Sequence, residues 1–131
     1  GAAGDVDTAV VTMIYADGKI TVIKNSRRAA YGYDQRIEIL GSEGLLQAEN
    51  IVENSVVKST TAGVLSAKPK YFFLERYIGA FKAEWDAFVK SIHDHKPVPV
   101  TLEDGVTALA IAEAATQSQN TGRTVQLKEV L

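Results

Sequence analysis

The first part of the chain alternates between two sets of side chains with a period of two, which is typical of β-strands. Residues 5–15 carry β-branched side chains on both parities, so both faces of the strand they predict are largely apolar. The pair Asp17-Gly18 follows, and such a pair marks a tight hairpin turn. We therefore expect residues 20–26 to return as the antiparallel partner of the first strand.

Further strand signals come after this hairpin. Residues 35–40 alternate polar and apolar side chains, and a turn at residues 41–44 leads into a partner strand at residues 45–49. Residues 55–61 are a weaker strand candidate, followed by a connection over residues 61–69 that ends in proline. The sequence thus predicts four or five strands.

The spacing of the apolar positions then changes to three and four residues. This pattern begins at Leu74 and predicts an amphipathic helix over residues 71–92, which carries most of the aromatic side chains. We expect this helix to be the main cover of the core. Residues 96–100 contain two prolines and should be extended, because each proline fixes its own φ and restricts the residue before it.

A second helix is predicted over residues 102–119. Thr101 and Asp104 have the spacing of a capping box at its start, and Gly122 follows its end. Residues 124–127 alternate again, which predicts a short strand at a sheet edge.

Strands first and helices second, with hairpin connections, predict an α+β fold. We expect a mostly antiparallel β-sheet that is covered on one face by two helices. The other face keeps apolar side chains, and a monomer rarely leaves such a face in water. We therefore expect this open face to form a homo-oligomer interface. The alternative is that Thr8 and Thr12 make one parity of the first strand polar enough to face water.

Composition and charge narrow the class of protein. The chain has 131 residues, of which 46% are hydrophobic and 23% charged, as expected of one globular domain. A net charge of -2 offers no cationic surface for nucleic acid. The sequence has no cysteine for a disulfide or thiolate zinc site, which favours a cytoplasmic location. We expect no membrane contact, since no apolar run could span a bilayer and residues 1–12 do not resemble a signal peptide.

The usual motifs for cofactors and catalysis are missing. None of the ten glycines forms a Gly-x-Gly-x-x-Gly motif or a P-loop, so we expect no nucleotide cofactor bound by this chain alone. His93 and His95 flank Asp94 at the end of the first predicted helix, where imidazoles interact favourably with the helix dipole. We predict no metal site there, and we assign no catalytic residue.

Residues 25–36 are the unusual segment, with three arginines, two tyrosines, an asparagine and an aspartate. Tyr31 and Tyr33 share one parity, and Gly32 between them permits close approach of a ligand or of the backbone. Each phenol combines an apolar ring with a hydroxyl group that donates or accepts, which suits a polyhydroxylated ligand. The alternative is that both tyrosines are cross-strand packing residues beside a solvated rim of arginines.

Three stretches carry a family resemblance. They are residues 25–44, with Tyr31-Gly32-Tyr33-Asp34 as the most specific part, residues 71–77, and the closing pattern of residues 97–125. Together they resemble the C-terminal domain of myo-inositol 2-dehydrogenases, in the glucose-fructose oxidoreductase/inositol dehydrogenase (Gfo/Idh/MocA) family. The likeness covers nearly the whole chain.

The resemblance implies a two-domain oxidoreductase that uses NAD to oxidise myo-inositol to 2-keto-myo-inositol. Residues 1–131 would be its C-terminal substrate-binding and oligomerisation domain, assembled as a tetramer or dimer through the open sheet face. The resemblance further implies that Tyr33 contacts the hydroxyl groups of the cyclic polyol, with Tyr31 as its neighbour. Arg28 and Asp34 would shape the pocket or the sheet junction. The family's Rossmann domain, which binds NAD, and its catalytic residues have no counterpart here, so the chain alone should be inactive.

Two other functions stay open. The chain could be a self-associating scaffold or interaction module without a catalytic role, in which the tyrosines belong only to the core. It could also come from a related sugar dehydrogenase of the same family that takes another cyclic polyol, because hydroxyl stereochemistry is read by side-chain geometry.

Overall fold

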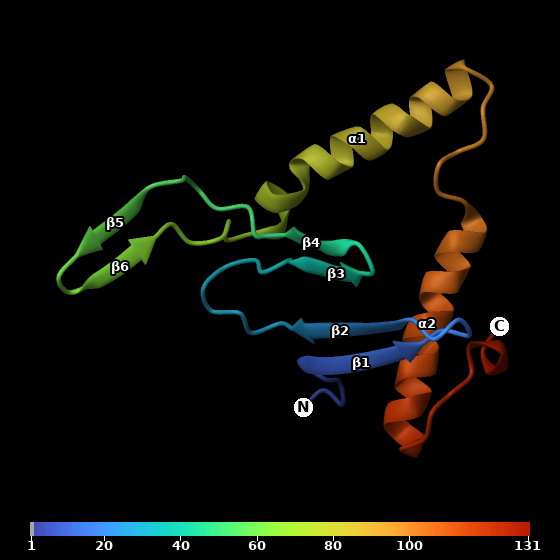
Figure 1. Ribbon diagram of the computed structural model, residues 1–131. Coiled ribbons are helices and arrows are strands. Elements are labelled where there is room, and N and C mark those ends of the chain that lie inside the picture. The colour runs from blue at the N-terminus through green and yellow to red at the C-terminus, as the bar shows by residue number, and fades with distance from the viewer. Residues whose placement is uncertain (1) are drawn as a thin grey trace. The chain divides into compact units, whose positions relative to one another are not determined.

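The computed structural model describes residues 2–131, so Gly1, the first residue of the predicted domain, lies outside the described residues. Within them the chain forms six strands, then two α-helices and a short 3-10 helix (Figure 1). It divides into two compact units, Gly1–Lys82 and Ala83–Leu131. Among residues 2–131 the strands precede the helices and pair only in antiparallel fashion, so the predicted α+β class is confirmed.

Strands β1 (Thr8–Ile14) and β2 (Ile20–Ser26) form the first hairpin, as the alternating pattern predicted. The register places Ile14 opposite Ile20. Gly18 adopts a φ of 85° in the turn, a conformation that glycine reaches without steric cost. Its N–H donates to the carbonyl oxygen of Tyr15 at 3.0 Å, which closes the turn.

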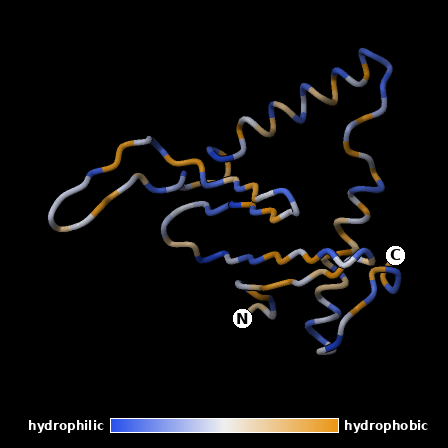
Figure 2. The backbone as a smooth tube through the Cα atoms, in the orientation of Figure 1, coloured by the Kyte–Doolittle hydropathy of each residue, from blue (hydrophilic) through white to orange (hydrophobic). Residues whose placement is uncertain are grey.

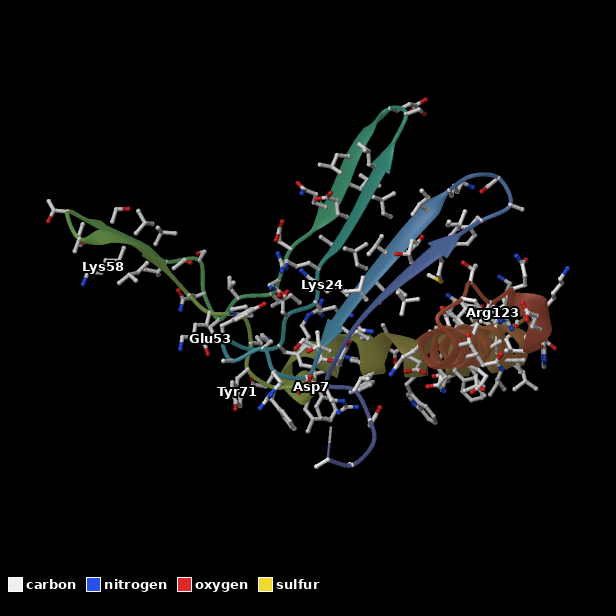
Figure 3. All side chains as sticks on the ribbon, turned by 90° about the horizontal axis from the view of Figure 1, so that it is seen from below. Asp7, Lys24, Glu53, Lys58, Tyr71 and Arg123 are labelled. Carbon is white, nitrogen blue, oxygen red and sulfur yellow. The ribbon has the colours of Figure 1, made fainter. Side chains whose placement is uncertain are left out.

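One face of this hairpin is exposed and carries apolar side chains beside the polar Thr8, Thr12, Lys24 and Ser26. Directly opposed residues of an antiparallel pair share a face. The side chains on this face that are 60–74% exposed are Val10, Ile14, Ile20 and Val22. On the other face, Val11 and Met13 are half-buried. Figure 2 shows apolar positions recurring along both strands, and Figure 3 shows side chains projecting from both faces. The hairpin thus exposes apolar side chains among polar ones, and the use of this face as an interface stays a prediction.

Two more hairpins follow in the first unit. Strands β3 (Ile37–Gly41) and β4 (Gly44–Ala48) pair as predicted. Strand β5 (Val57–Thr60) also lies within its predicted range, but it pairs with a strand that the sequence pattern did not indicate, β6 (Gly63–Ser66). The Thr60 hydroxyl oxygen accepts from Ala62 N–H at 3.2 Å and so supports a tight turn within the expected connection.

The strands do not form the single sheet that we expected. Each hairpin is its own two-stranded sheet, and outside the hairpins the described residues add only an isolated bridge between Val52 and Pro69. The physical reason lies in the connections, whose backbone groups bond to side chains and carbonyls of other loops. One example is the Gln35 N–H, which donates to the side chain of Asn50 at 2.7 Å instead of to a strand.

The two predicted α-helices are confirmed; they lie where strand-like alternation ends along the chain. Helix α1 (Phe73–His93) ends in a Schellman-like turn, in which His95 adopts a φ of 52° and Lys96 N–H donates to the carbonyl oxygen of Ser91 at 2.9 Å. Helix α2 (Leu102–Thr121) begins with the predicted capping box: Asp104 accepts from Thr101 N–H at 2.8 Å. No helix among residues 2–131 is long and apolar enough to cross a lipid bilayer.

The predicted strand at residues 124–127 is wrong. The chain instead forms a 3-10 helix, η1 (Leu127–Glu129), after Gly122 ends α2 in the left-handed conformation. Glu129 accepts from the backbone N–H of Gln126 at 2.7 Å and pairs with Arg123 at 2.7 Å. These local bonds use the donor and acceptor groups that a sheet edge would have required.

Candidate functional site

Three loop segments meet in the first unit, and we call them together the junction: residues 31–36, 50–53 and 68–70. Tyr33 N–H donates to the carbonyl oxygen of Lys70 at 2.8 Å, and Lys70 N–H donates to that of Ile51 at 3.0 Å. Glu53, which is labelled in Figure 3, donates its N–H to the carbonyl oxygen of Lys68 at 3.3 Å. The predicted ligand-binding segment is therefore fixed to two later loops and then, through residues 71–72, to the start of α1.

Gly32 is buried at the centre of the junction. Its φ is 138°, a value that residues with a side chain rarely adopt. A methyl group at this position would lie 2.7 Å from the carbonyl oxygen of Pro69 and 3.2 Å from that of Lys70. The expected close approach at Gly32 is confirmed, and it is made by the backbone.

Asp34 lies beside Gly32 and Tyr33, and its side chain is only 16% exposed. Its Oδ1 accepts from Arg36 Nε at 2.7 Å and from Asn50 Nδ2 at 2.8 Å. Its Oδ2 accepts from Arg36 Nη2 at 2.9 Å and from the hydroxyl group of Tyr31. These side chains form a closed network that we call the Asp34 clasp.

The clasp changes the acidity of its members. The bonds from Arg36, and then those from Tyr31 and Asn50, hold the pKa of the Asp34 carboxyl well below its usual range. The same carboxylate raises the pKa of the Tyr31 phenol and that of the Arg36 guanidinium. Asp34 is therefore a fixed negative charge that is paired inside the clasp.

Tyr33 points to a partner on helix α1. Its hydroxyl group donates to the hydroxyl oxygen of Tyr77 at 3.4 Å, and the two rings meet edge to face with centroids 5.5 Å apart. The bond to Tyr77 raises the pKa of the Tyr33 phenol. Arg76 lies over the Tyr77 ring at 5.8 Å, and the Phe81 ring lies beside that of Tyr77 with centroids 5.9 Å apart. Both tyrosines are half-buried.

Sequence reasoning missed Tyr77 as a site residue and counted it only among the aromatic side chains of the helix. The stretch 71–77, which carries part of the family resemblance, is the signal that could have identified it. Tyr31 and Tyr33 lie outside the strands, so neither is a cross-strand packing residue. The structure thus brings Tyr31, Tyr33 and Asp34 together at the junction.

Arg28 has a different surrounding. Its Nη1 lies 3.3 Å from the Oδ2 of Asp7, just before β1, and its side chain is 78% exposed. Its backbone N–H donates to the Ser26 hydroxyl oxygen at 3.2 Å. None of the bonds described for the clasp involves Arg28, and its role in a pocket stays a prediction.

The first turns of the two α-helices are unfavourable places for the pyrophosphate of a dinucleotide. A helix N-terminus that binds a pyrophosphate needs free N–H groups and a positive field. In α1 the first turn carries Glu75, and in α2 it carries Glu103 and Asp104, which would repel the phosphates. Residues 2–131 also contain no group of three or more histidine, aspartate and glutamate side chains that could hold a metal ion.

Comparison with known proteins gives one family and a set of named relatives. The family described as "Oxidoreductase family, C-terminal alpha/beta domain" matches residues 1–127. The myo-inositol 2-dehydrogenase of Thermotoga maritima is 46% identical over 131 residues, which are 100% of this chain and 39% of the relative. The inositol 2-dehydrogenase of Rhizobium meliloti is 42% identical over 118 residues, which are 90% of this chain and 36% of the relative. The chain therefore spans less than half the length of these proteins.

Solved structures give the same result. A probable dehydrogenase from Thermotoga maritima superimposes with a TM-score of 0.95 at 45% identity, over 99% of this chain and 39% of that one. A myo-inositol dehydrogenase from Corynebacterium glutamicum superimposes with a TM-score of 0.85 at 44% identity, over 91% of this chain and 36% of that one. A scyllo-inositol dehydrogenase from Lactobacillus casei was solved with NAD(H) and scyllo-inositol. It superimposes with a TM-score of 0.87 at 30% identity, over 97% of this chain and 37% of that one. The fold of this chain is thus found within larger dehydrogenases.

Proposed function

Since this chain belongs to the oxidoreductase family with a C-terminal alpha/beta domain, we propose that it is the C-terminal domain of an NAD-dependent inositol 2-dehydrogenase. The whole protein would oxidise myo-inositol to 2-keto-myo-inositol. Two relatives support this proposal, because the Thermotoga maritima protein at 46% identity and the Rhizobium meliloti protein at 42% identity are both named inositol 2-dehydrogenases.

The proposal divides the work between this chain and the rest of the protein. The first turns of α1 and α2 carry acidic side chains that disfavour a pyrophosphate, and the relatives are more than twice as long as this chain. NAD binding and the catalytic groups therefore belong to the part outside this chain. What this chain supplies is one wall of the polyol pocket, built on the junction.

The hydroxyl pair of Tyr33 and Tyr77 is the observation that carries the pocket wall. Because the Tyr33 hydroxyl group donates the hydrogen bond to Tyr77, the Tyr33 oxygen keeps an acceptor position. The Tyr77 hydroxyl group keeps its own O–H for donation to a ligand. An acceptor and a donor 3.4 Å apart match two neighbouring hydroxyl groups on a saturated ring. The aromatic rings beside them offer an apolar surface to the C–H face of such a ring.

A second candidate substrate is another cyclic polyol. The Lactobacillus casei structure, which contains scyllo-inositol, has the same fold at 30% identity and favours this candidate. A donor and acceptor pair recognises adjacent hydroxyl groups in either stereoisomer, so the choice depends on groups that contact the rest of the ring.

The substitution Tyr33→Phe tests the pocket wall in the full-length protein that contains this chain. We expect the KM for myo-inositol to rise about tenfold, because one hydrogen bond to the substrate is lost, while the KM for NAD stays unchanged. Steady-state kinetics with each substrate varied in turn would measure both values.

The matched control is Tyr15→Phe, which removes a tyrosine hydroxyl group at the turn after β1 and should leave both KM values unchanged. An unchanged KM for myo-inositol in Tyr33→Phe would contradict the pocket wall. A full-length protein that oxidises no inositol isomer would contradict the proposed function, and NAD reduction by residues 1–131 alone would contradict the division of work.

We also propose that the full-length protein is a homo-oligomer, a dimer or tetramer, assembled through the exposed face of the β1–β2 hairpin. The support is the row of exposed side chains at Val10, Ile14, Ile20 and Val22, whose burial would be favourable. Sedimentation equilibrium at micromolar concentration should give two or four times the chain mass. Replacing Ile14 and Val22 with lysine should shift the equilibrium toward monomer, and a wild-type monomer would contradict the interface.

A further inference from the structure

The carboxylate of Asp34 is saturated by donors of its own chain. Each oxygen accepts two hydrogen bonds: Oδ1 from Arg36 and Asn50, and Oδ2 from Arg36 and Tyr31. An ionised carboxylate has about four acceptor positions in total. Asp34 therefore has no acceptor position left for a hydroxyl group of a polyol.

The members of the clasp lie on both sides of Tyr33 in the sequence. Tyr31 comes from two residues before Tyr33, Arg36 from three residues after it, and Asn50 from the next loop. The side-chain oxygen of Asn50 also accepts from Gln35 N–H at 2.7 Å. The backbone after Tyr33 is thus tied to the loop at residue 50 by two separate bonds.

A second set of contacts fixes the backbone on the other side. The N–H of Tyr33 donates to the carbonyl oxygen of Lys70 at 2.8 Å, and Gly32 packs directly on the carbonyl groups of Pro69 and Lys70. These contacts fix the position of the Tyr33 Cα, from which its side chain starts. From that position, the bond to the Tyr77 hydroxyl group and the edge-to-face ring contact orient the Tyr33 side chain.

We propose that Asp34 is a positioning residue: it acts on the polyol through Tyr33, by holding the loop that carries this side chain, and does not bind the polyol itself. The substrate in this inference rests on the proposed function, whereas the geometry of the clasp does not. Positioning of this kind affects affinity because small displacements of a binding group lose much of its interaction energy.

A double-mutant cycle in the full-length protein separates the two roles of Asp34. Asp34→Asn keeps the shape of the side chain but places an NH₂ group against the donors of the clasp. We expect this change to raise the KM for myo-inositol about tenfold in the wild-type background, and less than about threefold in the Tyr33→Phe background. Effects that multiply fully in the double variant would show that Asp34 binds substrate independently, and would overturn the inference. An unchanged KM in the folded Asp34→Asn protein would overturn it too.

Amide hydrogen exchange provides a readout that does not depend on activity. In Asp34→Asn, we expect the Tyr33 N–H to exchange about tenfold faster, while amides of the β1–β2 hairpin keep their wild-type rates. Asp17→Asn is the matched control, because Asp17 also pairs with a cation, Lys19 at 2.7 Å, but lies in the β1–β2 turn. Equal acceleration at Tyr33 and in the hairpin, or no acceleration at Tyr33, would overturn the inference.

Two milder variants keep the test decisive if Asp34→Asn does not fold. Arg36→Lys retains the positive charge but loses the bidentate hydrogen bond to Asp34, and Tyr31→Phe removes one donor to Asp34. Each variant should raise the KM for myo-inositol by a smaller factor than Asp34→Asn does, and this factor should again shrink in the Tyr33→Phe background. KM effects that multiply fully in the double variant would overturn the inference. If the full-length protein oxidises no inositol, the proposed function fails, while hydrogen exchange still decides whether the clasp holds Tyr33.

Discussion

Replacing Gly32 with alanine lowers the free energy of unfolding by about 3 kcal/mol, the largest effect that we expect from one added methyl group in this chain. Two costs add at this position. The φ of 138° is strained for any residue with a Cβ, and the new methyl group would lie 2.7 Å from the carbonyl oxygen of Pro69. The backbone must move apart there, and the bond from Tyr33 N–H to Lys70 lengthens with it. Urea unfolding of the full-length protein, followed by tyrosine and tryptophan fluorescence, measures the loss.

Gly63 provides a matched control for this substitution. Its φ is 141°, nearly the same as that of Gly32, but no atom lies within 4 Å of an added Cβ. Gly63→Ala should therefore cost only the conformational strain, about 1 kcal/mol. The difference between the two variants isolates the close contact with Pro69. Equal losses at the two glycines would contradict the role that we give to this contact.

Acid should weaken the protein through Asp34. The folded state lowers the pKa of this carboxyl, with Arg36 as the largest cause, so the unfolded state binds its proton at a higher pH. The stability that the clasp supplies is thus complete above the unfolded pKa near 4, and is lost as the pH falls through lower values. As the pH falls from 5 to 2, we expect the wild type to lose more of its free energy of unfolding than Asp34→Asn does.

Urea unfolding at a series of pH values, for wild type and Asp34→Asn, measures this difference. The other titratable groups that act on the clasp are Arg36, the neutral phenol of Tyr31 and, through Arg36, Glu49. Arg36 and Tyr31 do not titrate below pH 5. Exposed carboxyls with a lowered pKa, such as Glu129, contribute equally to both proteins and cancel in the comparison. Parallel curves for the two proteins would show that the clasp carries no acid-sensitive stability.

The parts of the fold that the sequence predicted well are those with local signals. Asp17-Gly18 specifies the first turn, and Thr101 with Asp104 specifies the start of α2; in both cases the residues that make the bond lie within a few positions of each other. Strand β6 and helix η1 were missed because short segments have too few positions to show a period. At residues 124–127 the alternation was correct as a pattern, but the bonds made by Glu129 determined the structure.

The sequence indicated the loop that carries Tyr33, but not the partner residues that this loop contacts. The density of tyrosines, arginines and Asp34 within residues 25–36 is a local property of the chain, and it was sufficient to indicate this loop of the junction. Tyr77 lies 44 positions after Tyr33, and no spacing rule connects a loop to a helix over that distance. Arg28 belongs to the same dense segment, yet its pairing with Asp7 at 3.3 Å depends on how β1 and β2 align.

The separation of the strands into pairs matters for how the protein is handled in the laboratory. Within residues 2–131 every strand has one neighbour, so every strand also presents an unpaired edge of N–H and C=O groups. Such edges accept strands from other molecules and are starting points for aggregation. Ligand-binding and crystallisation experiments should therefore begin from the full-length polypeptide, and a recombinant fragment with these boundaries will need a solubilising fusion to remain dispersed.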